Sequence, residues 1–183
     1  MKLSDEQRDF LLKLARDTIK AALSHNPLPQ VTVDDPILAR PCGAFVTLHK
    51  GKQLRGCIGS LIGEKPLYIT IQEMAIESAF KDPRFPPLSA EELSQIEIEI
   101  SVLSPLERIT NVEQIEVGKH GIYLIKGFNR GVLLPQVATE YGWDRYTFLD
   151  NTCIKAGLPP GCWRSGAEIY IFSAEVFSEK NEK

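Results

Sequence analysis

The sequence predicts an α+β fold in which a mixed, largely antiparallel sheet is flanked by helices. Residues 96–103 (IEIEISVL) alternate between apolar and polar side chains, which is the period of a strand with one buried face. Residues 4–23 instead repeat apolar side chains at helical spacing. The predicted strands and helices follow one another in mixed order, and this favours antiparallel pairing over a parallel βαβ fold. A chain of 183 residues is long enough to bury a core as one domain.

The predicted N-terminal helix begins at a capping box. Ser4 and Gln7 are spaced so that each side chain accepts a hydrogen bond from a free backbone N–H of the first turn. The helix is expected to run to about Leu23, because an Asn-Pro pair follows it and begins an extended segment. Its apolar stripe is expected to cover a sheet.

A β-hairpin is predicted next along the chain. Residues 44–49 are rich in strand formers, 50–52 supply a turn, and 53–58 form the returning strand. A helix is expected to begin at Pro66, because proline suits the first turn of a helix. Residues 81–88 contain three prolines and are expected to lack regular structure.

The rest of the chain shows the same helix and strand signals. Helix starts are marked by capping residues or proline, and one helix end is marked by glycine. The predicted elements are a short helix begun by a capping box of Ser89 with Glu92, strands at 121–125 and 131–134 joined by a turn at 127–130, helices begun at Pro135 and Asp144, a left-handed terminator at Gly157, and a last strand at 168–177.

The composition limits the partners that we expect. With 24 acidic against 21 basic residues, the net charge is −3, so nucleic acid is a possible partner but is not favoured by charge. No run of about 18 apolar residues indicates a membrane span, and the N-terminus does not resemble a signal peptide. We therefore expect a cytoplasmic protein that does not bind membranes. The sequence indicates neither a cofactor nor an oligomeric state.

The four cysteines are expected to be free thiols. None forms a CxxC pair, and no secretory signal indicates an oxidising compartment. With three histidines in the chain and no clustered ligands, we expect no metal site. The four positions are Cys42, Cys57, Cys153 and Cys162.

The segment LRGCIGS, residues 54–60, is the best candidate for a functional site. Alternation along a strand places Arg55 and Cys57 on one face, where a guanidinium would favour the thiolate form of the cysteine. Gly56 and Gly59 remove bulk, so that a ligand or another backbone can approach closely. The alternative is a buried cysteine in a tight hairpin, with the arginine facing solvent.

Matches along nearly the whole chain identify it as resembling the AMMECR1 family. The LRGCIG motif lies within the first matching segment, and the other segments follow in the order of the family pattern. These segments are Gly43 to Leu61 (GAFVTLHKGKQLRGCIGSL), Ala79 to Leu88 (AFKDPRFPPL), Glu97 to Glu107 (EIEISVLSPLE), Gly118 to Leu124 (GKHGIYL), Leu133 to Trp143 (LLPQVATEYGW) and Lys155 to Pro159 (KAGLP).

The resemblance implies one AMMECR1-like domain over residues 1–183, divided into a larger and a smaller lobe whose boundary the sequence leaves open. It implies no established reaction. The family is associated with Memo-type and radical-SAM proteins in a proposed functional system, which makes these proteins possible partners.

The family pattern also indicates further site residues. Asp82 and Arg84 lie in the proline-rich loop, where Asp82 would pair with an arginine or orient a histidine. His120 is the natural candidate for a base beside Cys57. Gln136 would present its amide at a helix start, or simply cap that helix.

Three functions remain open from the sequence. In a cysteine-dependent enzyme, Cys57 would be the nucleophile, Arg55 would bind an anion, and His120 or Asp82 would transfer protons. In a non-catalytic binding module for a nucleotide, RNA or a protein, the charge would come from Arg55, Arg84 and Lys119. In a protein–protein adaptor, the motif would only build a tight hairpin.

Overall fold

A computed structural model of the chain describes residues 2–182. The chain forms two compact units, which are described one at a time. Unit 1 contains the chain up to Leu103 and again from Glu175 onward, and unit 2 contains Ser104–Ala174.

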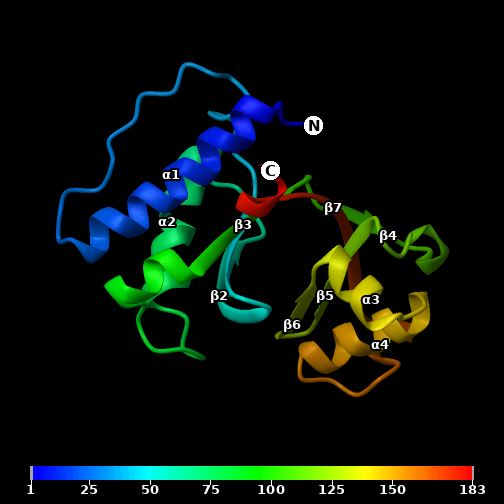
Figure 1. The fold of residues 1–183 in the computed structure, drawn as a ribbon. Coiled ribbons are helices and arrows are strands. Elements are labelled where there is room, and N and C mark those ends of the chain that lie inside the picture. Colours follow the sequence, from blue (N-terminus) through cyan, green and yellow to red (C-terminus); the bar gives the residue numbers. More distant parts are fainter. Residues whose placement is uncertain (1, 183) are drawn as a thin grey trace. The chain divides into compact units, whose positions relative to one another are not determined.

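Unit 1 is a layer of antiparallel strands covered by two helices. Its strands β1 (Ala44–Lys50), β2 (Gln53–Ser60) and β3 (Ile96–Leu103) pair in the order β2-β1-β3. Helices α1 (Asp5–Leu23) and α2 (Leu67–Phe80) pack on each other and against these strands (Figure 1). The apolar side chains of both helices and of β1 and β3 form one core, whose fully buried members include Leu11, Ile19, Leu48, Ile71 and Ile98.

The two capping boxes predicted in unit 1 are confirmed, whereas α2 begins one residue after Pro66. Ser4 caps α1, and its hydroxyl accepts from the N–H of Gln7 while the Gln7 side chain accepts from the N–H of Ser4. The capping box at Ser89 begins a 3₁₀ helix, η1 (Ala90–Gln95). The segment between α2 and η1 has no helix or strand, as its prolines predict.

Unit 2 has a sheet with helices packed on it. Strand β5 (His120–Lys126) pairs with β6 (Asn129–Leu133), and helices α3 (Pro135–Tyr141) and α4 (Arg145–Lys155) pack against them. Strand β4 (Glu107–Ile109) was not predicted, because three residues are too few to show a period. Short 3₁₀ helices complete the unit: η2 (Val112–Gln114) and η3 (Cys162–Arg164).

Strand β7 (Glu168–Ser178) belongs to both units. It pairs with β4 and β5 in unit 2 and also with β3. Its last residues return to unit 1, where Phe177 joins the core and Glu175 accepts hydrogen bonds from Arg8 and from the N–H of Leu3. The 3₁₀ helix η4 (Glu179–Glu182) follows. The prediction of an α+β fold with largely antiparallel sheets flanked by helices is confirmed.

The prediction of four free thiols is wrong for two of them. Cys153 on α4 and Cys162 form a disulfide, while Cys42 and Cys57 are free. Helix α4 ends at Lys155, and Gly157 follows it with a φ of 77° that lets the chain turn back, so the Cα atoms of the two bonded cysteines lie 5.9 Å apart. The linear spacing of nine residues does not reveal this approach, since it depends on the shape of the loop.

Within residues 2–182, no helix is long and apolar enough to cross a membrane.

Candidate functional site

The LRGCIG motif lies on β2, and this strand is interrupted at Arg55. Leu48 of β1 pairs with Gly56 and the next residue pairs with Leu54, so Arg55 has no partner on β1. Such an extra residue is a β-bulge, which re-aims side chains. The prediction that Arg55 and Cys57 act together assumed an unbroken strand. In the structure, the two side chains have different polar partners.

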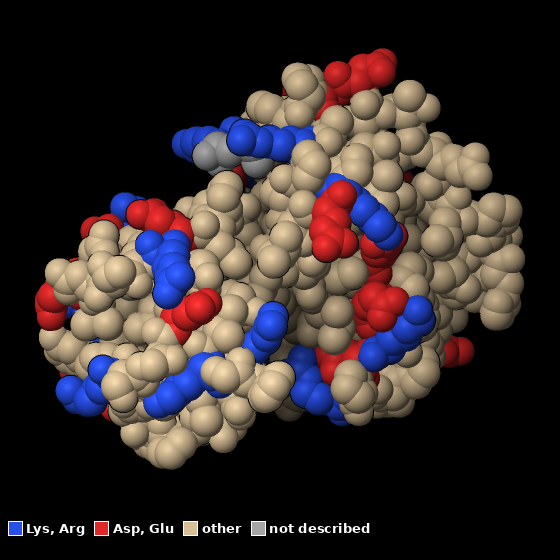
Figure 2. Space-filling model, turned by 180° about the vertical axis from the view of Figure 1, so that it is seen from behind, with Lys and Arg blue, Asp and Glu red and all other residues tan. Residues whose placement is uncertain are grey.

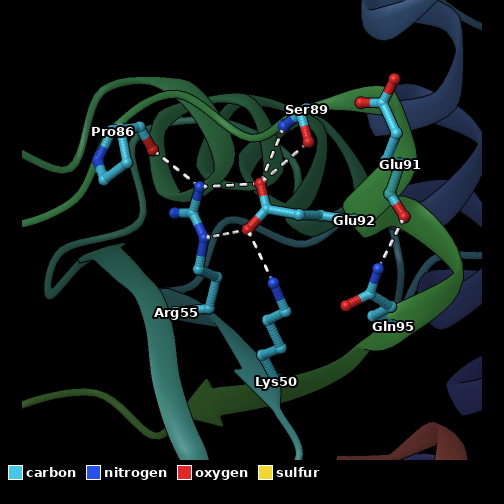
Figure 3. A network of polar contacts seen from close by, with 7 residues as sticks. All are labelled: Lys50, Arg55, Pro86, Ser89, Glu91, Glu92 and Gln95. Carbon is cyan, nitrogen blue, oxygen red and sulfur yellow. Dashed lines mark hydrogen bonds and ion pairs between the residues drawn. The ribbon is translucent and has the colours of Figure 1, made fainter.

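Arg55 is buried and forms an ion pair with Glu92 of η1 (Figure 3). Its Nε donates to Glu92 Oε1 at 2.9 Å, and its Nη2 donates to Glu92 Oε2 at 3.1 Å and to the carbonyl oxygen of Pro86 at 2.8 Å. The exposed fractions of the two side chains are 9% and 18%. The guanidinium is therefore bound within the chain and does not face solvent.

Glu92 is the centre of this network. Its carboxylate also accepts from the N–H of Ser89 at 2.9 Å and from Lys50 Nζ at 3.4 Å. The hydrogen bonds from Arg55 and from the Ser89 N–H lower the pKa of Glu92 to about 2. Nη1 of Arg55 is buried without a hydrogen-bond partner among the described residues, and the guanidinium carbon lies 5.9 Å from the centre of the Phe85 ring.

Asp82 and Arg84 complete the edge of the sheet at Cys57. Asp82 Oδ2 accepts from the N–H of Cys57 at 3.0 Å, and Arg84 Nη2 donates to the carbonyl oxygen of Cys57 at 3.3 Å. The two side chains also pair with each other, with Arg84 Nη2 2.8 Å from Asp82 Oδ2. Together they satisfy the outward backbone groups of one edge residue, as a neighbouring strand would.

The charges of this pair are strongly stabilised. The Arg84 guanidinium beside Asp82 holds the pKa of that carboxyl well below its usual range, and the backbone N–H groups of Cys57 and Arg84 add to the effect. The Asp82 side chain is 1% exposed and that of Arg84 is 52% exposed. Asp82 is therefore an ionised structural acceptor, and at neutral pH it does not hold a proton to transfer.

The pKa of the Cys57 thiol lies above its usual value. Burial raises its pKa, which outweighs a hydrogen-bond contact with the Thr47 hydroxyl at 3.2 Å and the charge of Arg84. The charges of Asp82 and Glu99 raise the pKa further. The predicted activation of the thiol by Arg55 is not seen, since Arg84 is the guanidinium that acts on it. The structure favours a protonated cysteine of low nucleophilicity.

The space beside the two motif glycines is filled by the chain itself. A Cβ at Gly56 would lie 2.2 Å from the carbonyl oxygen of Ser78 in α2, and a Cβ at Gly59 would lie 2.2 Å from the Phe45 ring. Glycine at these positions permits close packing of α2 and of Phe45. Binding roles for Gly56 and Gly59 stay predictions.

An apolar groove runs beside β2. It has a volume of about 700 Å³ and is bounded by Ile58 and Gly59 of β2, by α2, and by the extended residues 27–30. Gln72 of α2 donates to the carbonyl oxygen of Pro29 at 2.8 Å and so holds residues 27–30 against α2. The groove lies within unit 1 and adjoins the LRGCIG motif directly.

The other two predicted site residues belong to unit 2. The N–H of Glu116 donates to Nδ1 of His120 at 3.0 Å, so this ring nitrogen closes a local turn. Gln136 lies in the first turn of α3, and its Oε1 is buried without a partner among the described residues. Cys57, Asp82 and Arg84 are brought together in unit 1, and His120 and Gln136 belong to unit 2. Their proposed roles stay predictions.

Sequence reasoning missed Glu92 and Thr47 as parts of this site. Glu92 was assigned only to a capping box, which it does form, and the same carboxylate binds Arg55. Thr47 was treated as an ordinary strand residue, although its position opposite Cys57 in the hairpin follows from the register.

The described residues contain no group of three or more side chains suited to hold a metal ion. On the face drawn in Figure 2, acidic and basic side chains are interspersed.

The fold and this hairpin together define an α+β protein whose capped edge strand carries the LRGCIG motif. The chain belongs to the AMMECR1 family, whose model matches residues 12–177. It is 42% identical to a protein of Methanosarcina barkeri, over 97% of this chain and 93% of the relative. It is 44% identical to a protein of Methanopyrus kandleri, over 98% and 91% of the two chains. The crystal structure of an uncharacterized protein from Pyrococcus horikoshii is similar with a TM-score of 0.92 and 41% identity, covering 98% of this chain and 95% of that one.

Proposed function

We propose that this protein is a non-catalytic binding module whose partner is another protein, bound in the groove beside β2. The observation that carries the proposal is the apolar groove of about 700 Å³ next to the motif. Ile58, Ile69 and Ile76 line it together with Leu28, whose side chain is 44% exposed. Exposed apolar surface in a concave site is typical of sites that bind a protein or an apolar ligand.

The contacts within the motif support binding over chemistry. Two of the three guanidinium nitrogens of Arg55 are bound to Glu92 and Pro86, and burial raises the pKa of the Cys57 thiol. Asp82 and Arg84 hold the backbone of Cys57. The motif thus keeps one edge of the groove rigid, and a preformed site loses less entropy on binding. The cysteine-dependent enzyme stays a prediction, which the raised pKa of the Cys57 thiol does not favour.

Peptide selection tests this proposal. A library of random 12-residue peptides on phage is selected against the purified protein, and recovered peptides are synthesised and measured by fluorescence polarisation. Ile76→Asp should weaken binding at least tenfold, since a lost apolar contact of about 1.5 kcal/mol corresponds to about that factor. Leu28→Asp is a second groove variant at an exposed position.

Ile154→Asp is the matched control, because Ile154 is a 54% exposed isoleucine on helix α4 of unit 2, outside the groove. It should leave peptide affinity unchanged, and far-UV circular dichroism checks that each variant is folded. If no peptide is recovered, or if recovered peptides bind both groove variants as well as the control, the proposal is wrong. Memo-type and radical-SAM proteins, with which the family is associated, are the first natural partners to measure in the same assay.

A further inference from the structure

One backbone position of β2 faces the groove with its polar groups open. In an antiparallel ladder, alternate residues of an edge strand point their N–H and C=O away from the neighbouring strand. The contacts of Cys57 with Asp82 and Arg84 show that this residue points outward. The register with β1 is regular from Cys57 to Gly59, so Gly59 points its N–H and C=O outward as well.

The outward backbone groups of Cys57 are hydrogen-bonded, whereas those of Gly59 have no hydrogen-bond partner among the described residues. Asp82 and Arg84 occupy the position of a neighbouring strand at Cys57. At Gly59, no hydrogen bond from the described side chains reaches the backbone, and the residue lines the groove. An extended segment placed here would continue the line of the Asp82–Arg84 pair and would form a pair of backbone hydrogen bonds with Gly59.

The side of the groove formed by α2 is apolar with an acidic rim. Ile69 and Ile76 face the groove, although α2 already buries Leu67, Ile71 and Ala75 in the core, so this helix is apolar on a second side. Its two charged residues, Glu73 and Glu77, also line the groove. An apolar segment that carries a positive charge would match this surface.

The existing cation partners of these glutamates are easily displaced. Lys65 Nζ lies 2.5 Å from Glu73 and Lys81 Nζ lies 2.7 Å from Glu77, with the two lysine side chains 55% and 61% exposed. Ion pairs this exposed contribute little stability. A basic side chain of a ligand can replace either lysine at low cost.

We infer that the segment bound in the groove is an extended stretch of a partner protein that adds to the edge of β2 at Gly59. Its apolar side chains lie among Ile58, Ile69 and Ile76, and a lysine or arginine lies beside Glu73 and Glu77. This inference rests on the proposed protein-binding function and specifies the conformation and charge of the ligand. It predicts that bound sequences combine apolar, strand-forming residues with at least one basic residue and lack proline at the pairing position.

The first experiment measures amide hydrogen exchange by NMR, with the tightest peptide from the phage selection as the probe. Saturation with the peptide should slow exchange of the Gly59 amide at least tenfold. The amide of Gly51, in the exposed turn of the same hairpin, is the control and should not change. N-methylation should weaken the peptide at least tenfold at one position and little at the two adjacent positions, because adjacent residues of a strand point their N–H groups to opposite sides.

The second experiment measures the charge preference. The double variant Glu73→Gln/Glu77→Gln should weaken the peptide at least fivefold at low ionic strength and reduce the dependence of affinity on salt. Glu6→Gln/Glu91→Gln removes the same charge from exposed positions outside the groove and should change affinity less than twofold.

The outcomes separate this inference from the function on which it rests. A peptide that depends on Ile76 but leaves Gly59 exchange and every N-methylated position unaffected contradicts strand addition and leaves protein binding in place. A peptide whose affinity is equal in both double variants contradicts the acidic recognition. Failure to recover any peptide that depends on Ile76 contradicts the proposed function itself.

Discussion

Replacing Glu92 with glutamine tests whether the Arg55–Glu92 pair stabilises the motif. The substitution keeps the size of the side chain and one oxygen acceptor, but it leaves the Arg55 guanidinium, 9% exposed, without its counter-charge. The pKa of Glu92 falls from its usual 4.5 to about 2, which corresponds to at most about 3.4 kcal/mol. Because Glu92 is 18% exposed, solvent screening reduces this figure, and we expect a loss of about 2 to 3 kcal/mol.

Urea unfolding followed by far-UV circular dichroism measures the loss, with an unchanged m-value as the sign that only stability has altered. Glu91→Gln is the matched control, since the adjacent Glu91 is exposed and only its backbone oxygen accepts a hydrogen bond, from Gln95. It should stay within about 0.5 kcal/mol of the parent protein. If Glu92→Gln costs no more than this control, the pair is not a significant stabiliser.

The Arg55–Glu92 pair should also affect how the free energy of unfolding depends on pH in acid. A carboxylate whose folded pKa is depressed contributes stability that is complete above its unfolded pKa and is lost as the pH falls toward the folded pKa. The contribution of Glu92 should therefore be present above about pH 5 and fade between pH 4.5 and about 2. Glu92→Gln should make the free energy of unfolding less dependent on pH in this range. If the variant and the parent protein show the same dependence, Glu92 is not the group responsible.

Three further predictions concern the cysteines and the glycines. Iodoacetamide at pH 7.5 should alkylate folded Cys57 more slowly than a model thiol, because burial raises the pKa of the thiol, and a faster rate would support the enzyme hypothesis. Mass spectrometry of the unfolded, unreduced protein should find two alkylated cysteines and, after reduction, four; labels on Cys153 or Cys162 before reduction would contradict the disulfide. Gly56→Ala should cost about 2 kcal/mol or more, because its Cβ would meet a backbone oxygen, whereas Gly127→Ala, at a φ of 62° in open space, should cost about 1 kcal/mol. Equal losses in the two glycine variants, measured by urea unfolding, would contradict the packing argument.

The elements that could be predicted from the sequence depend on local chemistry. The capping box at Ser4, the alternation in β3 and the proline-rich break after α2 each involve residues within a few positions of one another. Asp144 caps α4, and Gly157 follows that helix in the left-handed conformation, as predicted. Such signals hold because a cap or a period is satisfied by the chain segment itself.

The details that were missed depend on contacts between distant residues. The bulge at Arg55 re-aims its guanidinium toward Glu92, which is 37 residues away in sequence. Asp82 reaches the N–H of Cys57 across 25 residues. The spacing of apolar and polar residues along the sequence predicts neither contact. The sequence pattern predicted that Arg55 and Cys57 form a reactive pair on one face of the strand. In the structure, Arg55 instead forms an ion pair with Glu92, and the backbone of Cys57 is hydrogen-bonded by Asp82 and Arg84.

The path of β7 has a consequence for the order in which the protein is built. Residues 104–174 are synthesised before the segment that starts at Glu175, so the sequence of unit 2 is complete before that of unit 1. Unit 1 then needs Phe177 to fill its core and Glu175 to bind Arg8 of α1. The larger unit therefore joins residues made before unit 2 with residues made after it, so its core closes only after the whole of unit 2 has been synthesised.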